Sequence, residues 1–152
     1  MNTLRIAKIG ELSELSDLCL RSKAHWGYDA GFIEACREAL TITPEDLKQD
    51  HVWVADGPDG ITGVLQVQTG VAVVVLDKLF IDPTAMGLGV GRLLFEKATE
   101  LAKATTATVM TIDADPGAES FYVKMGAKTV DKVPSTVIEG RTLPFMQYDL
   151  SP

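Results

Sequence analysis

One stretch, residues 71–103, constrains the fold more than any other part of the chain, because it joins an apolar run, a glycine-rich loop and an amphipathic segment. The apolar, β-branched run from Val71 to Ile81 predicts a buried strand. Pro83 is expected to end that strand, since proline cannot donate to a sheet ladder. Beyond the loop, apolar residues recur on one helical face, namely Val90, Leu94, Ala98 and Leu101. The stretch therefore predicts a strand, a glycine loop and a helix in succession.

The loop of this stretch is a candidate anion site. Gly87, Gly89 and Gly91 alternate directly before and within the start of the predicted helix. Glycine leaves backbone N–H groups uncovered, and the first helical turn has N–H groups without intrahelical partners, where the helix dipole adds positive charge. A phosphate group is the usual occupant of such a site. The alternative is a glycine turn that only lets helix and strand pack closely.

Composition limits the function classes. The chain has 152 residues, 46% of them hydrophobic, and we expect a single domain over residues 1–152. Its formal net charge of −7 argues against nucleic acid as a partner; it mildly favours a cationic substrate such as an amine, although acidity also commonly serves solubility. We expect no membrane span and no signal peptide, and hence a cytoplasmic protein. His25 and His51 are too few and too separated to propose a metal site.

The rest of the chain reads as alternating helices and strands. In the first strand, Leu4 and Ile6 are expected to face the interior, with Ala7 as a further candidate. The expected order is a strand over 4–9, helices from Glu11 and from Asp29, a short helix capped by Thr43, strands over 51–55 and 61–68, a strand over 108–113, a helix over 115–126, and strands over 128–133 and 145–150.

The segment LDKLFIDPTAMGLGVGRLLFEKA, residues 76–98, resembles the signature segment of the GNAT superfamily of N-acetyltransferases. The family carries Arg or Gln, two residues, Gly, one residue, and then Gly or Ala. Gly89 and Gly91 match, whereas Met86 replaces the Arg or Gln. The resemblance implies that acetyl-coenzyme A binds here, with its pyrophosphate in the loop and its thioester on the preceding strand. The implied cofactor-binding residues are Leu79, Phe80, Ile81, Met86, Gly87, Leu88, Gly89, Val90, Gly91 and Arg92.

A second segment, residues 115–127, is similar to the other hallmark of this superfamily. The matching residues are Ala118, Phe121, Tyr122 and Gly126, while Asp115 replaces the usual Asn and Ala127 the usual Phe. The resemblance implies that Asp115 and Phe121 contact the cofactor and that Tyr122 protonates the departing thiolate. A phenol, with a pKa of about 10, is a protonated donor at neutral pH. The alternative is that Tyr122 is only a core residue of an amphipathic helix.

The general base that would remove a proton from the attacking amine has no direct match to the family pattern in this sequence. Asp77, two residues before Leu79, is the best carboxylate on the strand, and Val75 stands where some family members carry Glu. Asp77 is therefore the predicted base, acting directly or through water, with His25 or bulk solvent as alternatives.

An aromatic cluster precedes the second helix. In a GNAT-like fold this region covers the part of the site that binds the acceptor, the amine to which the acetyl group is transferred. His25, Trp26 and Tyr28 are therefore the predicted acceptor-binding residues. The alternative is that they pack the corner between two helices. The connection over 134–144 is expected to reach the same pocket.

The predicted architecture is an α/β fold with a mixed, mostly antiparallel sheet that is splayed between the strands ending at Ile81 and Asp113 and flanked by helices. The predicted function is acetyl transfer from acetyl-coenzyme A to a primary amine of a small molecule or peptide, by direct attack in a ternary complex and without a metal. One alternative is a non-catalytic acyl-coenzyme A sensor or partner-binding module. A dinucleotide-binding unit is the other, but Arg92 stands where its third glycine is needed. Homodimer formation through the sheet is a further hypothesis.

Overall fold

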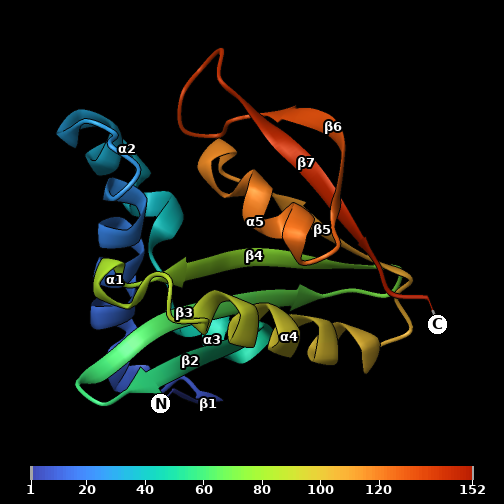
Figure 1. Cartoon of the computed structure of the whole chain (residues 1–152), viewed down its shortest axis with the longest axis horizontal. Coiled ribbons are helices and arrows are strands. Elements are labelled where there is room, and N and C mark those ends of the chain that lie inside the picture. Colours follow the sequence, from blue (N-terminus) through green and yellow to red (C-terminus); the bar gives the residue numbers. More distant parts are fainter. Residues whose placement is uncertain (1, 152) are drawn as a thin grey trace.

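The computed structural model describes residues 2–151, which form one sheet with helices on both faces (Figure 1). The strands are β1 (Thr3–Ile6), β2 (His51–Gly57), β3 (Gly60–Thr69), β4 (Val73–Ile81), β5 (Val109–Asp113), β6 (Lys128–Pro134) and β7 (Thr142–Asp149). The α-helices are α1 (Leu12–Ala24), α2 (Ala30–Leu40), α3 (Pro44–Gln49), α4 (Val90–Lys103) and α5 (Glu119–Lys124). Single-turn 3₁₀ helices are η1 (Ile9–Glu11), η2 (Pro83–Ala85) and η3 (Pro116–Ala118). The predicted fold class and element order are confirmed.

The sheet has the strand order β1-β2-β3-β4-β5-β7-β6, and only the β4–β5 pair is parallel. That pair is short: Val73 to Val75 bond to Val109 to Thr111, and the two strands part before they reach Ile81 and Asp113. This is the predicted splay. It opens the sheet at the carboxyl ends of two neighbouring parallel strands, the usual place for a ligand in an open sheet.

Two apolar clusters hold the layers together. Leu65 and Val67 of β3 pack in one cluster with α4, whereas Val64, directly before Leu65, packs in the other with α1, so the two helices cover opposite faces of the sheet. In α4 the predicted face is buried at Val90, Leu94 and Ala98, and it also includes Phe95 and Ala102, while Leu101 is only partly buried. Full burial of a side chain the size of Leu94 stabilises the fold by about 1.5–3 kcal/mol.

Helix starts follow the predicted capping chemistry. The Asp29 side chain accepts a hydrogen bond from the Phe32 N–H at 2.7 Å, which caps α2. Thr43 and Asp46 form a reciprocal capping box at the start of α3, with Pro44 as its first residue.

Several boundaries differ from the sequence prediction; the last strand, for example, begins at Thr142 rather than at Phe145. The first strand ends at Ile6, whose side chain is 63% exposed rather than facing the interior, and the chain turns into η1 at Ile9. β4 begins at Val73, because Val71 lies in the exposed connection from β3. The helix predicted over 115–126 is a 3₁₀ turn followed by α5.

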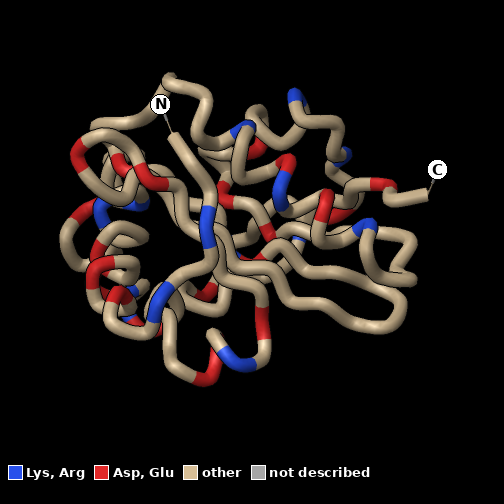
Figure 2. Tube along the Cα trace, turned by 90° about the horizontal axis from the view of Figure 1, so that it is seen from below, with Lys and Arg blue, Asp and Glu red and all other residues tan. Residues whose placement is uncertain are grey.

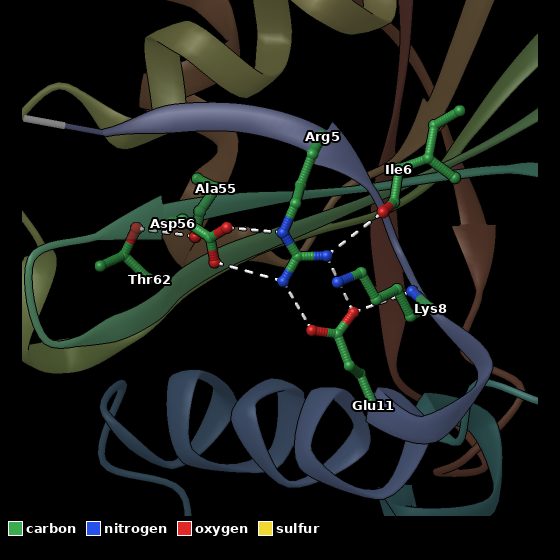
Figure 3. A network of polar contacts seen from close by, with 7 residues as sticks. All are labelled: Arg5, Ile6, Lys8, Glu11, Ala55, Asp56 and Thr62. Carbon is green, nitrogen blue, oxygen red and sulfur yellow. Dashed lines mark hydrogen bonds and ion pairs between the residues drawn. The ribbon is translucent and has the colours of Figure 1, made fainter.

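An ion-pair network fastens the first strand to its neighbours. The Arg5 guanidinium lies 2.6 Å from Glu11 and 2.5 Å from Asp56, and thereby joins β1, η1 and β2 (Figure 3). The hydrogen bond from Arg5 lowers the pKa of Glu11 below its usual value.

Elsewhere acidic and basic residues are interspersed along the chain (Figure 2). Within residues 2–151, no helix combines the length and hydrophobicity that a membrane crossing requires.

Candidate active site

A cleft of about 780 Å³ opens at the splay between β4 and β5. Its walls come from the end of β4, the glycine loop, η3 and α5, the end of α1, and the β6–β7 connection, as predicted for the last of these. The structure thereby gathers both sequence motifs around one cavity. The predicted site residues that line it are Trp26, Asp77, Leu79, Phe80, Ile81, Met86, Gly87, Gly89, Val90, Gly91, Arg92, Asp115 and Phe121.

Four predicted site residues do not line this cleft. Leu88 is 69% exposed on the outside of the glycine loop. His25 ends α1 and contacts the Trp26 ring edge-on, at 5.7 Å between centroids. Tyr28 lines a neighbouring hollow together with Phe32 and Arg141. The fourth, Tyr122, is buried and packs on Phe121, which does line the cleft.

The glycine loop has the conformation that an anion site needs. Gly87 and Gly89 have φ angles of +82° and +85°, which non-glycine residues rarely adopt. Gly89 is the cap residue of α4, and no side chain caps the helix, so that its first-turn N–H groups stay free for a ligand. Gly91 has a different role: a Cβ there would lie 3.0 Å from the Phe121 ring, so its small size lets α4 and α5 meet.

A β-bulge shapes the middle of β4. Gln66 pairs with Lys78 and Val67 with Leu76, which leaves Asp77 as the extra residue. The Asp77 carboxylate accepts a hydrogen bond at 2.8 Å from the buried ammonium of Lys78, which also donates to Gln66 at 3.1 Å. The bulge therefore presents the Asp77 carboxyl group at the cleft, where the largely buried side chain of Lys78 contacts it.

Asp113, at the end of β5, is a second cleft carboxylate that the sequence analysis did not propose as a base. Partial burial, together with the negative charge of Asp77, raises its pKa. The sequence feature that could have identified Asp113 as a candidate base was its position at the carboxyl end of a strand beside the predicted splay. A carboxylate with a raised pKa holds a proton more readily and is the better general base.

Tyr122 is 5% exposed and packs against Phe95 and Phe121. Burial, and secondarily the charge of Asp115, raises its pKa, so that the phenol is protonated at neutral pH. No side-chain polar atom within residues 2–151 is both fully buried and unpartnered, and the Tyr122 hydroxyl has no partner among these residues. The hydroxyl therefore keeps some accessible surface. This arrangement suits a proton donor placed behind the cleft wall.

Asp115 organises the end of the cleft near α1. Its carboxylate accepts hydrogen bonds from Lys23 at 2.8 Å, from the Gly117 N–H at 2.8 Å and from the Tyr28 hydroxyl at 3.0 Å, and Arg141 lies 3.6 Å away. Lys23 and Arg141 were not predicted as site residues. The carboxylate of Asp115 is thus held by protein donors, and its contact with a cofactor stays a prediction.

Trp26 closes the same end of the cleft. Its indole is 47% exposed, and a Cβ on Gly117 would lie 3.0 Å from the ring. Of the aromatic cluster, Trp26 therefore lines the cleft itself, and it does so by packing on the start of η3.

Comparison with known families agrees with this geometry. A family model described as an acetyltransferase (GNAT) domain matches residues 21–150. The chain belongs to the GNAT acetyltransferase family. The resemblance predicted from the two motifs is therefore confirmed.

Individual GNAT proteins resemble this chain over different lengths. Peptidyl-lysine N-acetyltransferase YjaB from Salmonella typhimurium is 40% identical over 99 residues, a match that spans 62% of either chain. A GCN5-related N-acetyltransferase from Rhodopseudomonas palustris has the same fold, with a TM-score of 0.84 and 20% identity over 99% of this chain and 96% of that one. The PaiA N-acetyltransferase from Thermoplasma acidophilum, solved with coenzyme A, has a TM-score of 0.80 and 16% identity over 98% of this chain and 99% of that one.

Proposed function

We propose that this chain transfers an acetyl group from acetyl-coenzyme A to a primary amine of a small molecule or peptide. The observation that carries the proposal is that the glycine loop at the start of α4 and the β4–β5 splay open into one cleft. The loop offers free N–H groups to a pyrophosphate, and Arg92 adds a positive charge beside it. The related PaiA protein was solved with coenzyme A, and YjaB is named a lysine acetyltransferase, which supports the same chemistry.

In the proposed reaction, amine and thioester meet in a ternary complex. The neutral amine attacks the thioester carbonyl carbon, and backbone N–H groups at Phe80 or Ile81, on the strand next to the splay, stabilise the oxyanion that forms. The nitrogen of this intermediate then loses one proton to a carboxylate of the cleft or to water, and collapse of the tetrahedral intermediate breaks the C–S bond to give the amide and a thiolate. Tyr122 donates its proton to that thiolate, and a phenolate so formed regains a proton from solvent.

The ammonium form of the acceptor must first lose a proton. Asp77 and Asp113 are the carboxylates at the splay, and either accepts this proton directly or through one water. Asp113 has a raised pKa, whereas the Asp77 carboxyl group already accepts a hydrogen bond from Lys78. We therefore assign proton removal to this pair, with Asp113 as the first candidate because its carboxyl group is not held by a cation within residues 2–151.

A non-catalytic acyl-coenzyme A sensor is the second candidate. Met86 brings neither a charge nor a hydrogen-bond donor to the loop, and the carboxylate of Asp115 is held by protein donors. Either departure from the family pattern is compatible with binding without turnover.

Calorimetric titration with acetyl-coenzyme A, and separately with NAD, tests the cofactor assignment. We expect saturable micromolar binding of the first and none of the second. Thiol release with a panel of amines then separates enzyme from sensor: turnover with any amine supports catalysis, and binding without turnover supports the sensor. Failure to bind acetyl-coenzyme A contradicts both.

A further inference from the structure

Two cationic side chains share one carboxylate at the α1 end of the cleft. Lys23 and Arg141 both line the cleft, and both lie near Asp115, at 2.8 and 3.6 Å. The three side chains are only 13%, 20% and 11% exposed. Two positive charges against one negative charge leave this end of the cleft with a net positive charge. Lys23 lies in α1 and Arg141 in the β6–β7 connection, and Figure 1 shows both segments on the same side of the molecule.

Most N–H donors of these cations are unused by the protein. An ammonium has three donors and a guanidinium five. Lys23 donates to Asp115, and Arg141 donates to the Tyr28 hydroxyl at 2.5 Å. No polar side-chain atom in residues 2–151 is both fully buried and unpartnered, so Nε and Nη1 of Arg141, which have no partner there, keep accessible surface. Lys23 and Arg141 both line the cleft, which is therefore the space that their unused donors can serve.

The guanidinium of Arg141 is also fixed in orientation. It lies over the rings of Phe32 and Tyr28, at 4.9 and 5.0 Å from their centroids. A planar guanidinium held in this way matches the two oxygens of a carboxylate, and a pre-ordered donor loses little entropy on binding.

The opposite charge gathers at the splay, where Asp77 and Asp113 line the same cleft. We propose that the acceptor is an amine that also carries a carboxylate, an amino-acid-like zwitterion, with its ammonium toward Asp77 and Asp113 and its carboxylate on Lys23 and Arg141. This inference rests on the proposed function and specifies its acceptor. A peptidyl lysine, which lacks a free carboxylate beside its amine, would leave the two cations without a ligand.

The test compares acceptors that differ only in the carboxylate. The wild-type protein is assayed with the standard α-amino acids and with their amides, at saturating acetyl-coenzyme A. We expect at least one amino acid to exceed its own amide in kcat/KM by about tenfold or more, because a charge-assisted pair is lost in the amide. Equal rates with amino acid and amide, or a preference for lysine peptides, would overturn the inference while the proposed acetyl transfer stands.

A binding measurement keeps the inference testable without turnover. N-acetyl amino acids and their amides, which are the corresponding products, are titrated into the protein saturated with coenzyme A. The acid is expected to bind about tenfold or more tightly than the amide. Equal binding overturns the inference, whereas failure of coenzyme A itself to bind refutes the proposed function. Inorganic phosphate is titrated as a third ligand, and a preference for phosphate over the acids also counts against the inference.

Variants assign the effect to the named residues. Arg141→Gln and Arg141→Lys are expected to raise KM for the amino acid far more than for the amide, with Arg141→Lys retaining part of the preference because it keeps the charge. Arg37→Gln, an exposed arginine of α2, is the matched control and should retain the preference in full. If Arg141→Lys folds normally and both acceptors change equally, Arg141 does not bind the carboxylate.

Discussion

The ammonium nitrogen of Lys23 lies 2.8 Å from a carboxylate oxygen of Asp115, although 92 positions separate the two residues. Burial opposes ionisation of Asp115, but hydrogen bonds from Lys23 and from the Gly117 N–H outweigh it, so that its pKa lies below the usual value. A lowered pKa means that the ionised group stabilises the fold above the unfolded pKa of about 3.9. That stabilisation is lost as the pH falls through the lower folded pKa.

Asp115→Asn should therefore destabilise the protein in a pH-dependent way. At pH 7 the free energy of unfolding should fall by about 1–3 kcal/mol, since two partly buried cations lose their counter-ion. The difference from wild type should shrink in acid, where Asp115 itself becomes protonated. Urea unfolding across this pH range measures it, with the exposed Asp59→Asn as control. A loss that is the same at every pH would contradict the ion-pair explanation.

Gly89→Ala tests the backbone of the anion site. Nothing lies within 4 Å of a Cβ at Gly89, so the penalty comes from its φ of +85° and should be about 1–2 kcal/mol. Because the loop must distort to relieve this strain, the Kd for acetyl-coenzyme A should rise by about five- to tenfold. Gly10→Ala, which also has open space but no positive φ, is the matched control and should change neither quantity.

Gly91→Ala should act by a different route. Its Cβ would meet the Phe121 ring at 3.0 Å, a contact that displaces the ring or separates α4 from α5. We expect the free energy of unfolding to fall by about 1–3 kcal/mol, as it does when a core is overpacked. In the double variant with Phe121→Leu, much of this loss should be recovered relative to Phe121→Leu alone. If Gly91→Ala is as stable as wild type, close packing does not require glycine here.

The features that were predictable are local in sequence. The glycine loop, the Asp29 cap and the Thr43 capping box each act within a few residues, so their patterns identify them directly. The splay was predictable only because two motifs matched a known family. By contrast, whether the Ile6 side chain faces the interior or the solvent depends on where the first strand ends, and a short alternating run does not determine that end.

The contacts on the acceptor side of the cleft could not be predicted, because they join residues far apart in the sequence. Arg141 meets Tyr28 across 113 positions, and Lys23 meets Asp115 only because α1, η3 and the β6–β7 connection converge. Spacing along the chain carries no signal for such contacts. Asp113 was visible as a strand-end carboxylate, but its raised pKa arises from burial and from Asp77 on another strand.

Arg5→Lys tests the network that fastens β1. The substitution keeps the charge but removes the fork that binds Glu11 and Asp56 together, and we expect a loss of about 1–2 kcal/mol in the free energy of unfolding. Arg37→Lys is the control, because its pair with Glu34 is exposed and contributes about 0.5 kcal/mol or less. Urea unfolding measures both. Equal small losses would show that the Arg5 network behaves as an ordinary surface pair.

Tyr122→Phe should separate catalysis from folding. The hydroxyl has no hydrogen-bond partner among residues 2–151, so its removal should leave the free energy of unfolding within about 0.5 kcal/mol of wild type. If the phenol protonates the departing thiolate, kcat should fall by about 10²-fold or more, with the Kd for acetyl-coenzyme A little changed. Thiol-release kinetics and calorimetry measure the two quantities, and Tyr148→Phe, at a tyrosine packed on Phe95 outside the cleft, is the matched control. An unchanged kcat in a chemistry-limited assay would reduce Tyr122 to a packing residue and would leave proton donation to solvent.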